Sequence, residues 1–413
     1  MRLPRVFQSL HNYNFRLFWF GQLVSLVGTW VQSVGQAWLV LELTDSPLAL
    51  GTVAALQFLP VLLLVLFAGV FVDRFPKRRL LLVTQSTAML QALALAILTS
   101  SGTVQLWHVY VLASLLGLVN AFDNPTRQAF VIEMVGRDEV VNAVALNSML
   151  FNSARILGPA VGGLLIASIG LAQCFYVNAA SFLAVLAGLL LMREDLIQSP
   201  PRRPAGRIFA QLLEGLHYAV HTPTVFVIVI LMATLGTFGY NFNTVLPLLA
   251  REALGVGATG FGALMSMMGV GSLAAALVVA AQQRSTPRRL FAGAIGFVIT
   301  LAALALSRWY PVSLALTLPL GFTSIIFTTS ANSSLQLGAP DALRGRVMSL
   351  YTLLFLGTTP IGGLVTGFLA EQWGIQWALG IEAFICGAGV LAAMAHQRRT
   401  MGPMGPPLEK HAG

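Results

Sequence analysis

Long apolar segments separated by short polar loops run through the whole chain. A helix needs about 20 apolar residues to cross the hydrocarbon core of a bilayer. Twelve segments reach that length, near residues 15–42, 48–72, 80–100, 106–132, 140–168, 171–192, 224–250, 258–283, 288–307, 310–334, 343–370 and 374–396. The pattern predicts an all-α membrane protein with twelve transmembrane helices.

The composition also indicates a membrane protein. Of 413 residues, 56% are hydrophobic and only 9% are charged, whereas soluble domains carry about 25% charged residues. The first apolar segment begins near Phe15 and is too long for a signal-peptide core, so we interpret it as an uncleaved first span. Cys174 and Cys386 both lie inside apolar segments, which implies neither a disulfide framework nor a metal site.

The basic residues are distributed asymmetrically across the predicted topology. With a cytoplasmic N-terminus, every Lys and Arg except Arg155, Arg251 and Arg308 falls on the cytoplasmic side. This asymmetry is what the positive-inside rule requires. It predicts that both termini are cytoplasmic, and it explains the net charge of +9 without a nucleic-acid partner.

A polar stretch divides the chain into two halves that are related in sequence. With an offset of 204 residues, Gly158 aligns with Gly362 and Gly163 aligns with Gly367. The predicted organisation is a six-helix bundle over 1–192, a cytoplasmic linker with a surface amphipathic helix over 193–222, a second six-helix bundle over 223–397 and a cytoplasmic tail over 398–413. Repeated halves around a midplane cavity are typical of secondary transporters.

The loop between spans two and three carries a specific motif, GVFVDRFPKRR, which begins at Gly69. It resembles the signature of the major facilitator superfamily, G-x-x-x-D-R/K-x-G-x-R/K-R/K, with Pro76 in place of the second glycine. The resemblance implies a cytoplasmic latch made of Gly69, Asp73, Arg74, Arg78 and Asp123. In such a latch Asp73 faces the start of span eleven, while Arg74 and Arg78 pair with Asp123.

The fifth span places a charge in the middle of the membrane, at Arg155. A G-P-x-x-G-G motif, typical of exporters in this superfamily, follows at Gly158, Pro159, Gly162 and Gly163. Pro159 cannot donate to the carbonyl of Arg155, so the helix can kink there. Helical periodicity puts Arg155 on one small, polar face with Asn152. Arg155 is therefore either a buried hydrogen-bonding group or a contact for an anionic or polar substrate.

Two spans carry polar stripes along one face. The stripe on span one consists of Gln22, Ser25, Thr29, Gln32, Ser33 and Gln36. The stripe on span seven consists of Thr234, Thr237, Asn241 and Thr244. Polar stripes on spanning helices face protein or water and seldom lipid. Both stripes are either packing contacts between helices or the lining of a substrate cavity.

Two acidic residues lie inside predicted spans. Asp123, near the inner end of span four, is either a latch partner or a proton carrier or substrate contact. Glu382, well inside span twelve, is either a buried neutral group that faces a partner helix or a proton-handling group. The repeat equivalent of Glu382 is Asn178.

Sequence signals of catalysis are absent, since the six histidines are scattered and there is no zinc, phosphate-loop or dinucleotide motif. The first span and its flanks resemble the bacterial branch of the superfamily that includes enterobactin exporters and macrolide-efflux proteins. The resemblance implies a monomeric transporter in the bacterial cytoplasmic membrane that needs no cofactor. The resemblance also implies export of a small amphipathic molecule, drug-like or siderophore-like, in exchange for protons. The alternatives are an importer or lysolipid flippase, or a transport-inactive receptor or assembly subunit.

Overall fold

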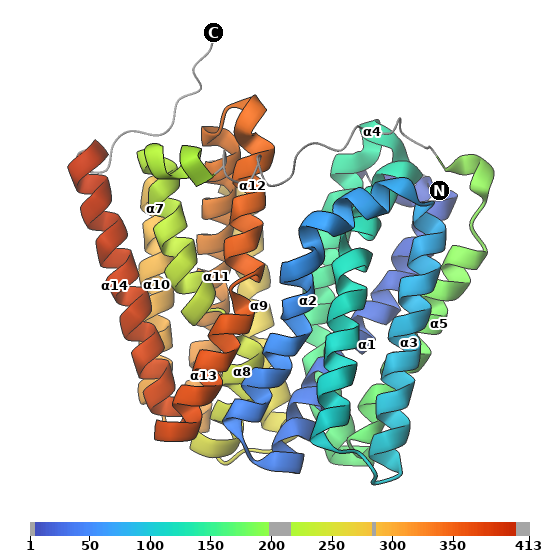
Figure 1. The fold of residues 1–413 in the computed structure, drawn as a ribbon, viewed down its shortest axis with the longest axis horizontal. Helices are drawn as coiled ribbons and strands as arrows, with labels where there is room; N and C mark the ends of the chain where they lie inside the picture. Colours follow the sequence, from blue (N-terminus) through green and yellow to red (C-terminus); the bar gives the residue numbers. More distant parts are fainter. Residues whose placement is uncertain (1–4, 198–215, 283–285, 402–413) are drawn as a thin grey trace. The chain divides into compact units, whose positions relative to one another are not determined.

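The computed structural model describes residues 5–197, 216–282 and 286–401, and nearly all of them are helical (Figure 1). Within these ranges, eleven helices are long and apolar enough to cross a membrane, and Pro223–Gly236 forms a shorter apolar helix. The all-α fold predicted from the sequence is confirmed. The predicted amphipathic helix of the linker falls largely on residues 198–215, which lie outside the described part of the chain.

Contacts between Cα atoms divide the chain into two compact units. Unit 1 contains residues 5–45, 56–197 and 257–266, and unit 2 contains residues 46–55, 216–256, 267–282 and 286–401. Each unit therefore includes one short segment from the other half of the sequence.

The helices of unit 1 come mainly from the first half of the chain. They are α1 (Tyr13–Thr44), α2 (Pro47–Arg74) from residue 56 onward, α3 (Lys77–Ser100), α4 (Leu106–Ile169) and α5 (Ala172–Leu190). Inside α4, Gly136 has a φ of 74°, which side chains disfavour, and it separates span four from span five. The core of the unit contains Phe15, Phe18 and Phe130, and the rings of Phe18 and Phe130 meet edge to face at 6.0 Å.

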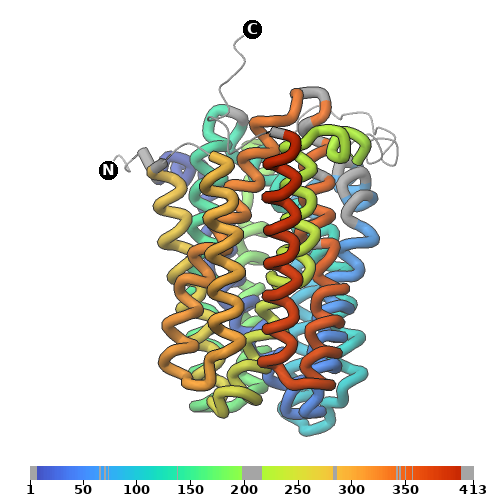
Figure 2. Tube along the Cα trace, turned by 90° about the vertical axis from the view of Figure 1, so that its left-hand side faces the viewer, coloured from blue at the N-terminus to red at the C-terminus, as the bar shows by residue number. Residues whose placement is uncertain are grey.

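The helices of unit 2 come mainly from the second half. They are α7 (Pro223–Leu231), α8 (Phe242–Leu248), α9 (Ala258–Gln282) from residue 267 onward, α10 (Pro287–Leu306), α11 (Tyr310–Gly338), α12 (Asp341–Leu356), α13 (Thr359–Trp373) and α14 (Ile375–Met401). Two π-helical turns, η3 (Met232–Gly236) and η4 (Leu249–Ala253), follow α7 and α8. The last helix, α14, packs along α7 and α10 (Figure 2).

Two predicted spans of unit 2 are interrupted. Span seven is not helical from Gly239 to Asn241, and the low helix propensity of Gly239 favours a break there. Span eleven is interrupted by a turn at Gly357 and Thr358, between α12 and α13. Pro360 favours this second break, because it has no N–H to donate to the carbonyl four residues earlier and is tolerated in the first turn of a new helix.

Candidate transport site

The polar stripe of α1 is divided between the interior and the surface of unit 1. Gln22, Ser25, Gln32 and Gln36 are buried, whereas Thr29 is exposed and Ser33 is half-buried. Gln32 donates to Gln91 Oε1 of α3 at 3.1 Å and accepts from Asn178 Nδ2 of α5 at 2.7 Å. At Gln32, the stripe is therefore a hydrogen-bonded contact between three helices.

Several buried amide atoms in unit 1 have no hydrogen-bond partner among the described residues. They are Nε2 and Oε1 of Gln22, Oε1 of Gln85 and Nε2 of Gln91. The residues involved are 2–3% exposed. Buried polar atoms in native proteins are satisfied by protein or by ordered water, so this interior is suited to holding water.

Asp123 lies in a dense set of donors. Its Oδ1 accepts from Thr84 Oγ1 and from Gln85 Nε2, each at 2.7 Å, and its Oδ2 is ion-paired with Arg127, one turn along α4. The side chain is 3% exposed. Two neutral donors and one cation therefore compensate the carboxylate.

The expected pairing of Arg74 and Arg78 with Asp123 is not formed. Arg78 is ion-paired with Glu194 and donates to the carbonyls of Leu189 and Leu190 at the end of α5, while Arg74 is exposed. Those carbonyls are unpaired within their helix and attract a cation. The surroundings of Gly69 and of the Asp73 side chain lie outside the described part, so the latch itself stays a prediction.

The G-P-x-x-G-G segment of α4 is packed on two sides within unit 1. A Cβ added to Gly158 would lie 2.3 Å from Cβ of Trp30 in α1. A Cβ added to Gly163 would lie 2.6 Å from the carbonyl oxygen of Ala258, at the start of α9. Side chains at these two positions are excluded by the close approach of the neighbouring helices, which is the role that small residues have in membrane bundles.

Arg155 and Asn152 lie one to two turns before Gly158, the first glycine of this segment, and both are half-buried. Asn152 donates to the carbonyl of Ser148 at 2.8 Å. The sequence has no Asp or Glu between Glu139 and Glu194. Helix α1 has none before Glu42, and α3 has none at all. Asp123, the acidic residue inside span four, is already ion-paired with Arg127 of the same helix.

In unit 2, the predicted cavity residues Thr237 and Asn241 lie at the break in span seven. They are 7% and 4% exposed, and Asn241 Nδ2 donates to the carbonyl of Thr237 at 2.8 Å. Asn241 Oδ1 has no partner among the described residues. Both residues face Gly362 of α13, where an added Cβ would lie 1.9 Å from the Thr237 carbonyl oxygen.

Tyr240, between these two residues, anchors the break to the rest of unit 2. Its hydroxyl donates to the carbonyl of Ser324 at 2.8 Å, and its ring stacks on Phe297 at 5.0 Å and meets Phe355 at 5.3 Å. Aromatic contacts of this kind fix the position of the break and provide a half-buried aromatic face.

Glu382 of α14 is completely buried, and its Oε1 is hydrogen-bonded with the hydroxyl of Thr366 in α13. Sequence reasoning missed Thr366, although a signal was present. The offset of 204 residues aligns it with Gly162 of the exporter motif.

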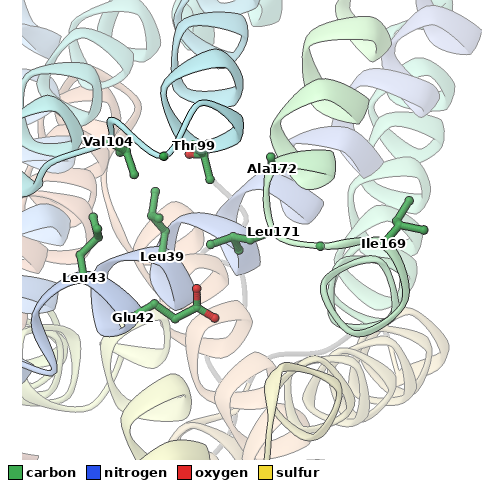
Figure 3. Close-up of a pocket in the computed structure, with 10 residues that line it drawn as sticks. Leu39, Glu42, Leu43, Thr99, Val104, Ile169, Leu171 and Ala172 are labelled. Carbon is green, nitrogen blue, oxygen red and sulfur yellow. The ribbon is translucent and has the colours of Figure 1, made fainter.

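A separate pocket opens at one end of unit 1, next to Gly102 and Gly170. Its volume is about 460 Å³, and Figure 3 shows Glu42 extending among Leu39, Leu43 and Leu171. None of the predicted cavity or proton-coupling residues lines it. We therefore do not assign the pocket to the transport site.

Relatives of the chain are transporters. It is 26% identical over 370 residues to the staphyloferrin A transporter of Staphylococcus aureus, covering 87% of this chain and 90% of the relative. It is 28% identical to the multidrug efflux pump Tap of Mycolicibacterium fortuitum, covering 86% and 89%. It is 22% identical over 390 residues to the enterobactin exporter of Shigella flexneri, covering 93% and 92%.

Solved structures show the same fold. A bacterial homologue of the human lysosomal transporter Spinster, in an inward-facing conformation, superposes with a TM-score of 0.75 at 12% identity, covering 96% of this chain and 98% of that one. A D-xylose–proton symporter superposes with a TM-score of 0.68 at 15% identity, covering 96% and 97%. The family described as transmembrane secretion effector matches residues 5–404. The chain therefore belongs to the transmembrane secretion effector family of the major facilitator superfamily, whose members are multi-pass membrane transporters and not enzymes.

Proposed function

We propose that this transporter exports a small amphipathic molecule, drug-like or siderophore-like, by alternating access. The observation that carries the proposal is the G-P-x-x-G-G segment of α4, whose Gly158 and Gly163 are pressed against α1 and the start of α9. Seams of small residues let helices approach and slide, which alternating access needs. Relatives named for staphyloferrin A, for enterobactin and for multidrug efflux support the substrate class.

The substrate contacts are proposed from both halves of the chain. Arg155 and Asn152 supply a cation and an amide on one face of span five, which favours substrates with anionic or hydrogen-bonding oxygens. The exposed Thr29 and half-buried Ser33 of the α1 stripe are better placed for contact with substrate than the buried Gln32. Thr237 and Asn241 are the corresponding candidates of the second half.

Protons are the proposed counter-ion, and the two candidate carriers differ in their surroundings. Asp123 is compensated by Arg127, Thr84 and Gln85, which supports a structural role for an ionised carboxylate. Glu382 has one hydroxyl partner and no cation among the described side chains that contact it. These contacts favour Glu382 over Asp123 as the carrier.

The setting of the transporter follows from the sequence. We propose a monomer in the bacterial cytoplasmic membrane with both termini in the cytoplasm, because the positive-inside rule holds for nearly every basic residue. The latch formed by Asp73, Arg74 and Arg78 remains part of the proposal. Its partner for Arg78 is revised to Glu194.

Reconstituted vesicles test the function directly. The purified protein is placed in liposomes with an acidic lumen and a trapped pH-sensitive dye, and siderophore-like, macrolide and cationic-dye compounds are added one at a time. Substrate-dependent proton efflux is the expected result. Proton efflux that is the same with and without every compound would contradict proton-coupled export.

A further inference from the structure

Thr366 of α13 has two hydrogen-bonding neighbours in the interior of unit 2. Its Oγ1 lies 2.8 Å from the carbonyl oxygen of Gly362, one turn earlier on the same helix. The same Oγ1 is hydrogen-bonded with Oε1 of Glu382 on α14. Thr366 and Glu382 are both 0% exposed. The three groups therefore form one short hydrogen-bonded chain that is shielded from bulk water.

The number of hydrogens in this chain depends on the charge of Glu382. A threonine hydroxyl carries one hydrogen and can accept others, whereas a carbonyl and an ionised carboxylate only accept. With an ionised Glu382, the single hydrogen of Thr366 would have two acceptors and one contact would stay unmade. With one proton on Glu382, the carboxyl donates to Thr366 and Thr366 donates to Gly362. A bound proton completes the chain.

The charged groups around Glu382 are remote from it. On the elements packed against α14, they are Arg288 and Arg289 in the first turn of α10, Glu371 in the last turn of α13, and Arg251 and Glu252 in η4. On α14 itself, the basic residues lie in the last turns, and the nearest titratable group is Cys386, one turn away. Oε2 of Glu382 has no partner among the described residues. No cation in this part of the structure is placed to balance an ionised carboxylate, whose burial would be costly.

We infer that Glu382, Thr366 and the carbonyl of Gly362 form a proton-binding site inside unit 2. The inference rests on the proton exchange proposed above and deepens it by naming the site and its hydrogen-bonding geometry. Thr366 is a positioning residue in this site, because it holds the protonated carboxyl and links it to the backbone of α13.

The break in span seven lies close to this site. Cys386 Sγ lies 3.8 Å from the carbonyl of Thr234, and α14 runs antiparallel to α7, so Glu382 is level with the residues one turn beyond Thr234. Those residues lead directly to Asn241, whose Oδ1 has no partner among the described residues. Gly362 is in close contact with both Thr237 and Asn241. A water molecule at this break would reach the site without passing through an intact helix.

Infrared difference spectroscopy of the purified protein in lipid nanodiscs tests the site without any transport. At neutral pH, subtracting the spectrum of Glu382→Gln from that of the wild type should leave the C=O stretch of a protonated carboxylic acid. The paired stretches of a carboxylate in that difference would overturn the inference. Glu371→Gln is the matched control, because Glu371 is an exposed carboxyl on α13 and should leave the acid band unchanged.

Thr366 variants provide a second readout if Glu382→Gln does not fold. Thr366→Val removes the acceptor, so the acid band should shift to higher frequency, and Thr366→Ser should restore it. An unshifted band in Thr366→Val would overturn the assigned geometry. An acid band at Glu382 without substrate-driven proton flux in liposomes would refute the proposed exchange and leave the site intact. Proton flux without the band would refute the site and leave the exchange intact.

Discussion

Asn178 and Glu382 occupy equivalent positions in the two halves of the sequence, but the hydrogen-bond partners of their side chains differ. In unit 1, the amide of Asn178 donates to Gln32 at 2.7 Å and accepts from Ser181 at 3.2 Å. In unit 2, the hydroxyl of Thr366 is the one hydrogen-bond partner of the Glu382 side chain among the described residues. A neutral amide that both donates and accepts matches its neighbours as it stands, whereas the carboxyl matches them only when it carries a proton.

The difference indicates a division of labour between the halves. The first half keeps a neutral hydrogen-bonded contact between α1, α3 and α5, and it carries Arg155, a proposed substrate contact, inside span five. The second half carries an acid at the equivalent of Asn178 and a threonine, Thr359, at the equivalent of Arg155. We therefore propose that the first half recognises the charge of the substrate and the second half binds the proton.

The largest effect is expected from removing the acid of unit 2. Glu382→Gln keeps the size of the side chain and supplies a permanent donor to Thr366, so the protein should fold and substrate-driven proton flux should fall to background. Flux in proteoliposomes measures this, with Glu371→Gln as the control. Wild-type proton flux in Glu382→Gln would show that Glu382 does not carry the exchanged proton.

Asp123→Asn should act on stability and leave proton flux in place. The substitution leaves the partly buried Arg127 without its ion-pair partner, which should cost about 2 kcal/mol of unfolding free energy. Thermal unfolding in detergent measures the loss, and the liposome assay measures the flux. If flux disappears while the protein stays folded, the carrier belongs to unit 1 and the division proposed here is reversed.

Asn178→Leu tests whether the amide of unit 1 is a packing contact. Gln32 would lose a donor in a buried position, so the unfolding free energy should fall by about 1–2 kcal/mol, with transport retained. Asn178→Asp sharpens the result, because an acid here faces the amide oxygen of Gln32 and the hydroxyl of Ser181 and gains no cation. A fully stable Asn178→Leu protein would show that the contact contributes nothing.

Arg155→Gln should weaken the apparent affinity for anionic substrates by roughly tenfold, about 1.4 kcal/mol, and leave neutral compounds unaffected. The measurement is the substrate concentration for half-maximal flux with matched anionic and neutral analogues. Thr359→Ala, at the equivalent position of the second half, is the control and should change neither value. If Arg155→Gln weakened the affinity for anionic and neutral analogues equally, Arg155 would not recognise the charge of the substrate.

Glu371→Gln is expected to have the smallest effect. Its carboxylate accepts from the Ser46 hydroxyl at 2.7 Å and from the Leu48 N–H at 3.0 Å, both at the start of α2. Because the side chain is exposed and an amide oxygen can replace the carboxylate oxygen, the unfolding free energy should change by no more than about 0.5 kcal/mol. A larger change in thermal unfolding would show that this contact matters beyond its exposure.

The sequence predicted the family, the helical fold and the positions of the apolar spans, because hydrophobic length and the placement of basic residues reflect the bilayer directly. The Asp123–Arg127 pair was predictable, since residues four apart share a helix face, but Asp123 was instead expected to pair with Arg74 and Arg78. The pairing of Arg78 with Glu194 and of Glu382 with Thr366 could not be predicted, because each depends on how two separate helices pack. The break at Tyr240 and Asn241 was hidden for a similar reason, since apolar residues continue on both sides of it.

The grouping of residues 46–55 with unit 2 has a mechanical consequence for α2. This helix is continuous from Pro47 to Arg74, yet its first turns belong to one unit and the remainder to the other. Pro60 lies just past the crossing and leaves the carbonyl of Leu56 without its backbone N–H, which weakens the helix at that point. The helix is thus most easily bent near residues 56–60. If its two ends move relative to each other, we expect the bending to occur there. Amide hydrogen exchange in that stretch would report the bending as local opening during turnover.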